Sequence, residues 1–524
     1  MDTLRDSASL PDAFRLDLEQ RLADHTGTDV RVYDRSVQHV GEVTYLLARL
    51  GPHRTLVALG GEEVPFAVAE TLDHAAGPLR LCPSTEANAG VLRDTFPWTA
   101  PQPLGTETAV GCGDRLGLAT PGHIQACRAT GVRPVLAQQS IREMARTGRT
   151  PQNVLDDACW AVFQEGYTDG FGADADHLKT PEDVDRCVAA GFTMYTIDPS
   201  DHVDNEADAL EAGALDERFD ALPWEGLAIT PEACIQRYVG APIEVHGASG
   251  TVSIQFDDRA LRRAAVKYAA AIAHTKQLAE YLAKRYRTNR PNETFDLEMS
   301  VDETAHPTRP REHFFVAAEL DRLGIAVTSL APRFVGDFQK GIDFIGEQDA
   351  FEDAFAQHAR IAGALGDYKL SIHSGSDKFS IYPIMGRHAG NRLHLKTAGT
   401  SYLEALRVAA RHAPALLRAI VDFAFERFEA DRKTYHVTTD LDAIPDPANV
   451  PDDALEATYL GDEDGRQLLH LTYGSVLTAQ QDGAPRFKDR LFAVLNEHEE
   501  THYDVLKSHF LRHINGVLEG RSRE

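Results

Sequence analysis

Short apolar runs alternate with amphipathic segments along most of the chain beyond residue 105. Eight of these runs have the length and composition of strands, and they are 108–114, 134–139, 170–176, 192–198, 294–300, 326–332, 368–374 and 392–398. Segments with helical spacing separate several of them, at 120–131, 150–166, 180–191 and 311–324. A strand–helix unit repeated eight times predicts an α/β fold, a (β/α)₈ TIM-barrel-like domain.

Capping residues support these helices. Thr120, Thr150 and Thr180 each precede a proline, and a threonine cap followed by proline at the first helical position is a common helix start. Each of the same three segments ends in a glycine, which is a common helix stop.

Residues 1–105 have a different pattern, and we expect them to form a small N-terminal α/β module. Residues 29–37 and 55–61 have the composition of strands, and residues 62–75 have helical spacing. The proline-containing stretch 97–105 is expected to link this module to the barrel.

Two segments interrupt the repeat within the catalytic domain, which we place at residues 106–524. Residues 203–290 end in a long helical pattern, and residues 430–475 lack regular periodicity. We expect both segments to be insertions into the barrel.

Composition indicates a large, globular cytoplasmic protein. The chain has 524 residues, of which 43% are hydrophobic, and this length suits more than one domain. No run of about 18 apolar residues predicts a membrane span, and the N-terminus lacks the pattern of a secretory signal. The six cysteines are scattered without a CxxC pair, which favours a reducing compartment over a disulfide framework.

The formal net charge of −27 narrows the possible partners. A strongly acidic surface repels nucleic acids and anionic membranes. We therefore expect a small-molecule substrate, and the sequence makes no prediction of oligomeric state.

Histidines at the predicted strand ends indicate a divalent metal site, because the active site of such a barrel lies at the carboxyl ends of its strands. The candidate ligands are His177, His373 and His394. Alternation points His373 and His394 into the barrel, whereas it points His177 outward unless its strand has already ended. His202 is an alternative ligand.

Carboxylates at the same strand ends could divide general acid and base catalysis. Asp176 and Glu303 are the candidate pair. Glu298 is a rival to Glu303, because alternation points Glu298 inward. An ion-pair or capping role is the alternative for each of them.

Basic residues near the strand ends could hold an anionic substrate. The stretch HSGSDK at 373–378 offers backbone N–H groups, two hydroxyls and the ammonium of Lys378. Arg115 and Arg333 follow other strand ends, and we expect them to bind a substrate carboxylate together with Lys378. Pairing of the two arginines with neighbouring carboxylates is the alternative.

Several other classes of protein are disfavoured. The sequence contains no GxGxxG between a strand and a helix, no GxxxxGK[ST] and no GxSxG. A metal-dependent sugar aldolase or ketol-isomerase would use similar ligands and stays an alternative, as does a sugar-binding protein without catalysis.

Long motifs in a fixed order carry a family resemblance. They are GDRLGLATPGH, AQQSIREMARTGRT, LDDACWAVFQEGY, GFGADADHLK, FTMYTIDPSDHV, SVDETAHPT, SIHSGSDKFSIYP, LKTAGTSYLEA and LTYGSVL. By these motifs the chain resembles the tagaturonate epimerase family from about Gly111 to the C-terminus. The N-terminal module and residues 205–250 match the family only weakly.

The resemblance implies an isomerase that interconverts D-tagaturonate and D-fructuronate in hexuronate catabolism, and it leaves 4-epimerisation of fructose and tagatose open. It implies that His177, His373 and His394 bind the metal, that Asp176 is the base and that Glu303 is the acid. Zn²⁺ suits three imidazoles with an open position, while Mn²⁺, Co²⁺ and Ni²⁺ stay open. Retro-aldol cleavage and direct proton abstraction are the two possible mechanisms.

Overall fold

Eight parallel strands close into a barrel in the computed structural model, which describes residues 10–247, 250–397 and 399–521. The strands are β7 (Ala109–Gly111), β8 (Arg133–Ser140), β9 (Gly172–Leu178), β10 (Met194–Ile197), β13 (Asp296–Val301), β14 (Ser329–Pro332), β15 (Lys369–Ile372) and β16 (Leu393–Lys396). Pairing of β16 with β7 closes the barrel. Each strand overlaps one of the eight predicted runs, so the predicted barrel is confirmed. Ala398, at the end of the last run, lies outside the described residues.

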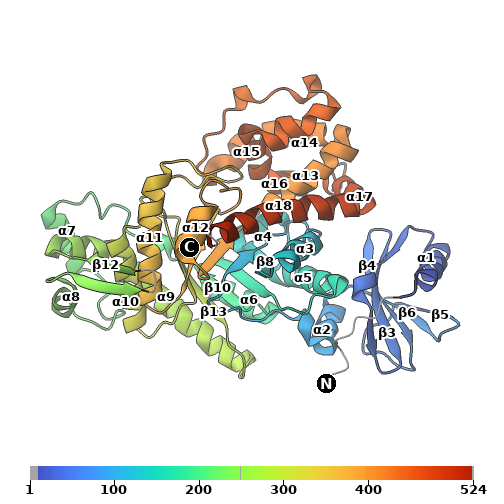
Figure 1. The fold of residues 1–524 in the computed structure, drawn as a ribbon, viewed down its shortest axis with the longest axis horizontal. Coiled ribbons are helices and arrows are strands. Elements are labelled where there is room, and N and C mark those ends of the chain that lie inside the picture. The colour runs from blue at the N-terminus through green and yellow to red at the C-terminus, as the bar shows by residue number, and fades with distance from the viewer. Residues whose placement is uncertain (1–9, 248–249, 398, 522–524) are drawn as a thin grey trace.

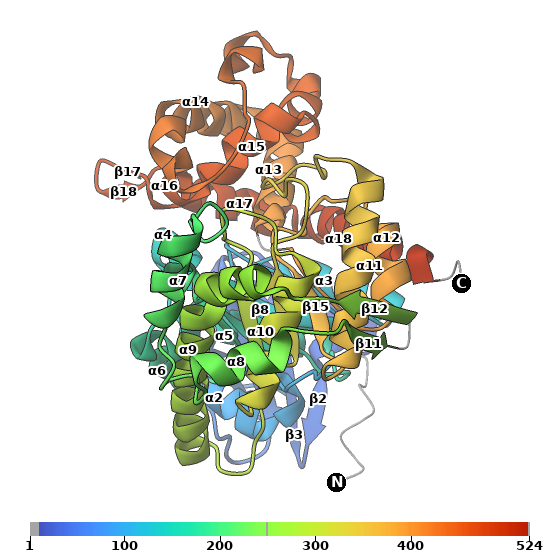
Figure 2. The same ribbon diagram turned by 90° about the vertical axis from the view of Figure 1, so that its left-hand side faces the viewer.

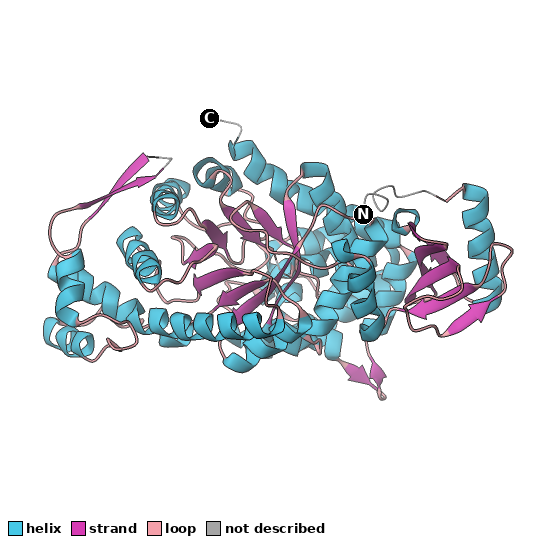
Figure 3. Ribbon diagram, turned by 90° about the horizontal axis from the view of Figure 1, so that it is seen from below, coloured by secondary structure: helices cyan, strands magenta, loops and turns pink. Residues whose placement is uncertain are grey.

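Helices follow most of the barrel strands and surround them (Figure 3). They include α3 (Thr120–Thr130), α4 (Ile141–Thr147), α5 (Pro151–Glu165), α6 (Pro181–Ala190), α10 (Pro310–Arg322), α11 (Gln348–Ala364) and α12 (Tyr382–Ala389). Thr150 and Thr180 cap α5 and α6 through their hydroxyls, as the Thr-Pro pattern predicts, whereas Thr120 lies inside α3. The four helices predicted from spacing are confirmed.

The N-terminal module is an antiparallel sheet beside the barrel, shown in blue in Figure 1. Helix α1 (Asp12–Thr26) accompanies strands β1 (Val30–Val32), β2 (Gln38–Val40), β3 (Val43–Leu50), β4 (His53–Gly60), β5 (Glu70–Leu72) and β6 (Leu79–Pro83). The helix predicted over 62–75 is wrong, because the segment contains no helix and its residues 70–72 form the edge strand β5, which pairs with β6. Residues 1–9, most of the stretch examined for a signal, lie outside the described residues.

Ring stacking and hydrogen bonds hold the connection between this module and the barrel in place. Helix α2 (Glu86–Thr95) leads into the short turn η2 (Pro97–Thr99). Trp98 stacks on Phe163 of α5 at 5.7 Å between ring centroids. The backbone N–H groups of Leu104 and Gly105 donate to the Asp296 carboxylate of β13.

The segment between β10 and β13 forms a separate lobe, seen at the left of Figure 1. It contains α7 (Ala212–Asp220), α8 (Pro231–Tyr238), the hairpin strands β11 (Ile243–Gly247) and β12 (Gly250–Ile254), and α9 (Asp258–Asn289). The 32-residue helix α9 returns the chain to the barrel and packs against α6 and α10.

The C-terminal segment is helical and stands over one end of the barrel (Figure 2). It contains α13 (Thr400–His412), α14 (Pro414–Asp431), α15 (Glu463–Leu471), α16 (Tyr473–Thr478), α17 (Lys488–Glu497) and α18 (Glu499–Arg521). Short turns fill the chain between α14 and α15, and α18 packs against α3 and α12.

Unusually for a barrel of this type, polar groups fill much of its interior. Glu298, Lys369 and His394 are fully buried on β13, β15 and β16, whereas branched apolar residues usually dominate such interiors. The apolar cores lie instead between the strands and the helices. Among the described residues, no helix is both long and apolar enough to cross a membrane.

Candidate active site

A cavity of about 420 Å³ opens at the carboxyl ends of the barrel strands. Most of its lining side chains are polar or charged, and they include Arg115, Arg142, Glu143, Asp176, His177, Asp302, Glu303, Arg333, Lys340, His373, Lys396 and Tyr435. Tyr435 comes from the C-terminal segment, so that segment helps to enclose the cavity. This volume suits a ligand the size of a sugar acid.

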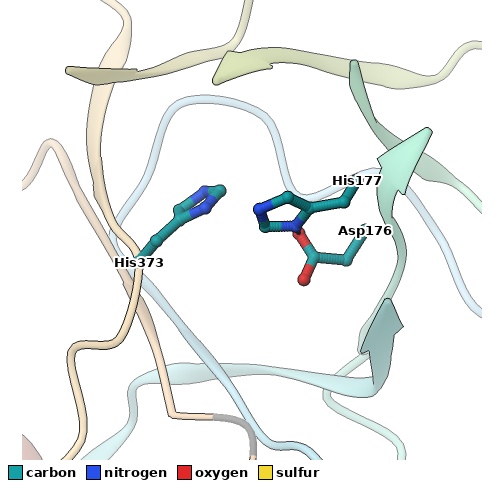
Figure 4. Close-up of side chains that lie close together, drawn as sticks. All are labelled: Asp176, His177 and His373. Carbon is teal, nitrogen blue, oxygen red and sulfur yellow. Dashed lines mark ion pairs between the residues drawn. The ribbon is translucent and has the colours of Figure 1, made fainter. Parts of the chain in front are cut away.

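Three side chains at the floor of the cavity could hold a metal ion. One ligand atom from each of Asp176, His177 and His373 lies within 4.8 Å of the others. Figure 4 shows the two imidazoles facing each other from β9 and the end of β15, with the Asp176 carboxylate beside His177. The nitrogen and oxygen donors suit a divalent cation, and the group fits the expected metal.

A backbone irregularity turns His177 toward this group. His177 has a φ of +58°, and the pairing of β9 with β10 shifts register next to it. The irregularity lets the consecutive residues Asp176 and His177 both face the cavity, although strict alternation would separate them. His202 does not line the cavity; its ring stacks on His274.

Carboxylates surround His373. Its Nε2 lies 2.6 Å from Glu298 Oε1, and its Nδ1 lies 3.3 Å from Asp302 Oδ1. Burial favours the neutral ring, but Asp302 and Glu298 outweigh it and raise the pKa of His373 to about 10. The carboxylates of Glu298 and Asp302 therefore already compensate a positive charge on His373, at the place where a metal cation would bind.

Lys396 is the centre of the buried charge network. Its Nζ lies 2.8 Å from both Asp174 and Asp176 and 2.9 Å from Glu298. Burial would lower the pKa of Lys396, but the three carboxylates outweigh it and raise that pKa well above its ordinary value. Lys396 and His177 together hold the pKa of Asp176 well below its usual range despite burial, so Asp176 is ionised.

His394 lies deeper in the barrel than the cavity. It is fully buried two residues before Lys396, and it is not among the cavity-lining residues. Neither ring nitrogen has a hydrogen-bond partner among the described residues. Burial, reinforced by the Lys369 ammonium, lowers the pKa of His394 well below its ordinary value, so the ring is neutral.

The two rival glutamates occupy different environments. Glu298 is fully buried, accepts a 2.5 Å hydrogen bond from Ser329, and contacts His373 and Lys396. Glu303 lines the cavity, its side chain is 38% exposed, and its carboxylate lies 3.0 Å from Arg142. Glu303 can therefore reach a substrate, whereas the oxygens of Glu298 are already committed to protein groups.

The three predicted carboxylate-binding cations also differ. Arg115 lines the cavity, but it pairs with Glu143 at 2.5 Å and stacks on Tyr473. Arg333 lines the cavity and donates to the backbone carbonyl of Thr304. Lys378 does not line the cavity.

Lys378 is fully buried, and its ammonium donates to the backbone carbonyls of Gln339, Ile342 and Ser376. The structure therefore gives no support to the predicted substrate contact of Lys378, which stays a prediction. The direction of the Lys378 side chain could not be predicted, because the alternation of inward and outward side chains ends with strand β15 at Ile372.

The lining residues that were not assigned roles from the sequence include Arg142, Asp302, Lys340 and Lys396. Alternation with His394 places Lys396 inward, so its position could have been predicted. Arg142 lies within one of the family-like motifs. Lys340 belongs to an irregular loop after β14 and carries no sequence signal that we can identify.

The fold and cavity together define a TIM-barrel enzyme with acid–base groups, a candidate metal site and several cations facing its substrate. The family model for tagaturonate epimerase matches residues 33–517. The chain therefore belongs to the tagaturonate epimerase family, which makes it an isomerase-class epimerase of keto-uronates.

Individual relatives agree with this assignment. The chain is 42% identical to a tagaturonate/fructuronate epimerase of Thermotoga maritima, over 95% of this chain and 98% of the relative. It is 40% identical to the fructuronate-tagaturonate epimerase of Cohnella laeviribosi crystallised with one glycerol. That comparison covers 97% of this chain and 99% of the other, with a TM-score of 0.86.

Proposed function

We propose that the chain interconverts D-tagaturonate and D-fructuronate at the cavity, as a step of hexuronate breakdown. The observation that carries the proposal is the meeting of Asp176, His177 and His373 at the floor of a cavity whose rim carries Arg333 and Glu303. Fructose and tagatose, which lack the carboxylate, are secondary substrates in this proposal. The six unpaired, buried cysteines support a reducing, cytoplasmic setting.

The chemistry of the substrate constrains the mechanism. The inverted carbon is β to the ketone, so its C–H bond is not acidified by enolisation. We propose retro-aldol cleavage, in which Asp176 takes the proton of the hydroxyl on the inverted carbon and the bond toward the ketone breaks. Glu303 lies on the cavity wall and would return a proton when the bond re-forms on the opposite face.

His177 and His373 would hold the divalent metal, and His394 is the expected third ligand. When bound, this ion supplies Lewis-acid stabilisation of the negative charge that develops on the ketone oxygen. The two unpartnered nitrogens of His394 favour a ligand role. Asp302 is a second candidate, because its Oδ1 lies 3.3 Å from His373 and 3.8 Å from His177.

The ordered network behind these groups has a positioning role. Lys396 holds Asp176 in place, and Glu298 accepts from Ser329 while contacting His373. Both restrict the orientation of residues that face the substrate. Zn²⁺ is the preferred ion in this proposal, and metal-replacement experiments with Mn²⁺, Co²⁺ and Ni²⁺ would test that preference.

The test of the proposed function is to incubate metal-loaded protein with D-tagaturonate and follow the products by ¹³C NMR. Conversion to an equilibrium mixture with D-fructuronate supports the proposal. Accumulation of cleavage fragments alone would indicate an aldolase, and movement of the carbonyl would indicate a ketol-isomerase. The Asp176→Asn variant is the matched control for background reactions.

A further inference from the structure

The cavity contains five lysine or arginine side chains from the described residues, and most are neutralised by the protein itself. Arg115 pairs with Glu143 at 2.5 Å, and Arg142 pairs with Glu303 at 3.0 Å. Lys396 contacts three carboxylates in the barrel interior. Each of these three cations therefore has a carboxylate partner in the protein before any substrate binds.

Arg333 and Lys340 are different. Within the described parts of the chain, neither has a carboxylate within ion-pair distance: Arg333 donates to the Thr304 carbonyl, and Lys340 donates to the Ser374 hydroxyl at 2.6 Å. The nearby Asp337 carboxylate instead accepts from Gln339 and lies 3.4 Å from His436. Two unmatched positive charges therefore face the cavity, and a charged ligand could match them.

The loop that carries Lys340 is held rigidly. The buried Lys378 ammonium donates to the carbonyls of Gln339 and Ile342, on both sides of Lys340. Arg466 of α15 donates to the carbonyl of Gly341 at 2.7 Å. Because its flanking backbone is fixed, Lys340 presents its charge beside Ser374, the residue that follows His373.

We infer that Lys340 and Arg333 bind the substrate's terminal carboxylate, and that this anchor retains the cleaved fragment while it turns. The inference rests on the proposed function. Numbered along the ketose, the ketone is C2, the inverted carbon is C4 and the carboxylate is C6. Loss of the C4 hydroxyl proton to the base breaks the C3–C4 bond, and the electron pair passes to C3, giving an enediolate and a C4 aldehyde.

The carboxylate stays on the aldehyde fragment, C4 to C6. This fragment must turn about its C4–C5 bond to present the other face of the aldehyde before the C3–C4 bond re-forms. Anchoring at C6 leaves this rotation free while preventing escape of the fragment. The anchor thus favours epimerisation over release of dihydroxyacetone and a three-carbon aldehyde acid.

The test compares Lys340→Met and Arg333→Met with Lys340→Arg, which keeps the charge, and with Lys284→Met, which removes an exposed lysine of α9 that does not line the cavity. Steady-state rates are measured on D-tagaturonate and D-tagatose, and released dihydroxyacetone is quantified. Losing a charge-assisted contact should lower kcat/KM for the uronate by about 10- to 100-fold. The value for tagatose should change by less than about threefold, and dihydroxyacetone release per uronate turnover should rise.

Lys340→Arg should recover most of the uronate activity, and Lys284→Met should leave the rates on both sugars close to those of the wild type. Equal losses on both sugars in Lys340→Met and Arg333→Met would overturn the anchor. Absence of dihydroxyacetone from both variants would overturn its role in retaining the fragment.

A binding measurement separates this inference from the proposed function. D-Galactonate carries the carboxylate but no ketone, so it cannot react, and it should raise the melting temperature of the wild type. That shift should shrink in Lys340→Met and persist in Asp176→Asn. If the wild type fails to epimerise tagaturonate while this pattern holds, the proposed function fails and the carboxylate anchor stands. An unchanged shift in Lys340→Met would overturn the anchor.

Discussion

Two clusters among the described residues have the same composition, one aspartate and two histidines with ligand atoms within 4.8 Å of one another. The first, Asp176, His177 and His373, lines the cavity. The second, Asp377, His509 and His513, is buried between the loop after β15 and helix α18. Only the first adjoins space for a substrate.

The second cluster already uses its lone pairs within the protein. The amide N–H of Asp377 donates to His513 Nε2 at 2.9 Å, and His513 Nδ1 lies 2.8 Å from the His509 carbonyl. Asp377 pairs with Arg466 at 2.8 Å. Spacing alone therefore does not make a metal site. The first cluster also has charged partners, with Lys396 2.8 Å from Asp176, and it differs from the second because it lines a cavity that an ion and a substrate can enter.

The largest effect should come from removing a ligand of the first cluster. We expect His373→Ala to lose bound metal and at least about 10³-fold in kcat, because Lewis-acid stabilisation contributes several kcal/mol. His513→Gln, the matched change in the second cluster, should retain wild-type metal content. Elemental analysis of both purified variants checks this, and full metal content in His373→Ala would exclude His373 as a ligand.

The next largest difference should be between substitutions of the two aspartates, Asp176 in the first cluster and Asp377 in the second. Asp176→Asn should lower kcat by about 10²- to 10⁴-fold, the scale of a lost general base. Asp377→Asn should mainly lower the free energy of unfolding, by about 3–5 kcal/mol, because it removes the carboxylate partner of Arg466, whose side chain is only 11% exposed. Denaturant titration and steady-state kinetics on both variants distinguish these effects, and a stable, inactive Asp377→Asn would contradict the comparison.

Substitutions of Glu303 and Glu298, which both lie near the first cluster, should differ by a smaller amount. Glu303→Gln should lower kcat by about 10²-fold or more with little change in stability, because Glu303 is half-exposed on the cavity wall. Glu298→Gln should reduce both stability and metal content, because it disturbs Lys396 and His373. Near-wild-type kinetics in Glu303→Gln would exclude it as the acid.

The smallest effect concerns pH. Burial, with His509 nearby, lowers the pKa of His513 to about 3, whereas an unfolded histidine titrates near about 6.5. Between these values the unfolded chain binds the extra proton, so stability falls as pH decreases from 6.5 toward 3. Between pH 7 and pH 5, His513 should contribute about 2 kcal/mol of this loss.

His513→Gln keeps an acceptor for the Asp377 amide and cannot titrate, so its stability should depend less steeply on pH. Urea unfolding of the wild type and the variant at pH 7, 6 and 5 measures the difference. Parallel stability curves for the two proteins would show that His513 does not titrate on unfolding.

The strands were predictable from the sequence because each is a short apolar run between turn residues. Residues 62–75 were not, because the apolar positions of an irregular segment can mimic helical spacing, and only the pairing of residues 70–72 with β6 reveals the strand within it. Backbone pairing between distant segments is decided by tertiary structure.

The site was predictable where alternation governs it. His373, buried at the end of β15, and Lys396 on β16 both face the cavity, as the alternation of side chains along a strand requires. His177 depends on a positive φ at the end of β9, which its residue type does not signal. Lys340 and Lys378 lie beyond strand ends, where neighbouring loops decide which lysine reaches the cavity.

The most direct test of the account is to locate the metal by anomalous X-ray scattering from crystals of the protein loaded with Mn²⁺. We expect a peak bounded by His177 and His373 at the floor of the cavity, with no peak at Asp377, His509 and His513. An empty cavity site, or a peak at the second cluster, would contradict it.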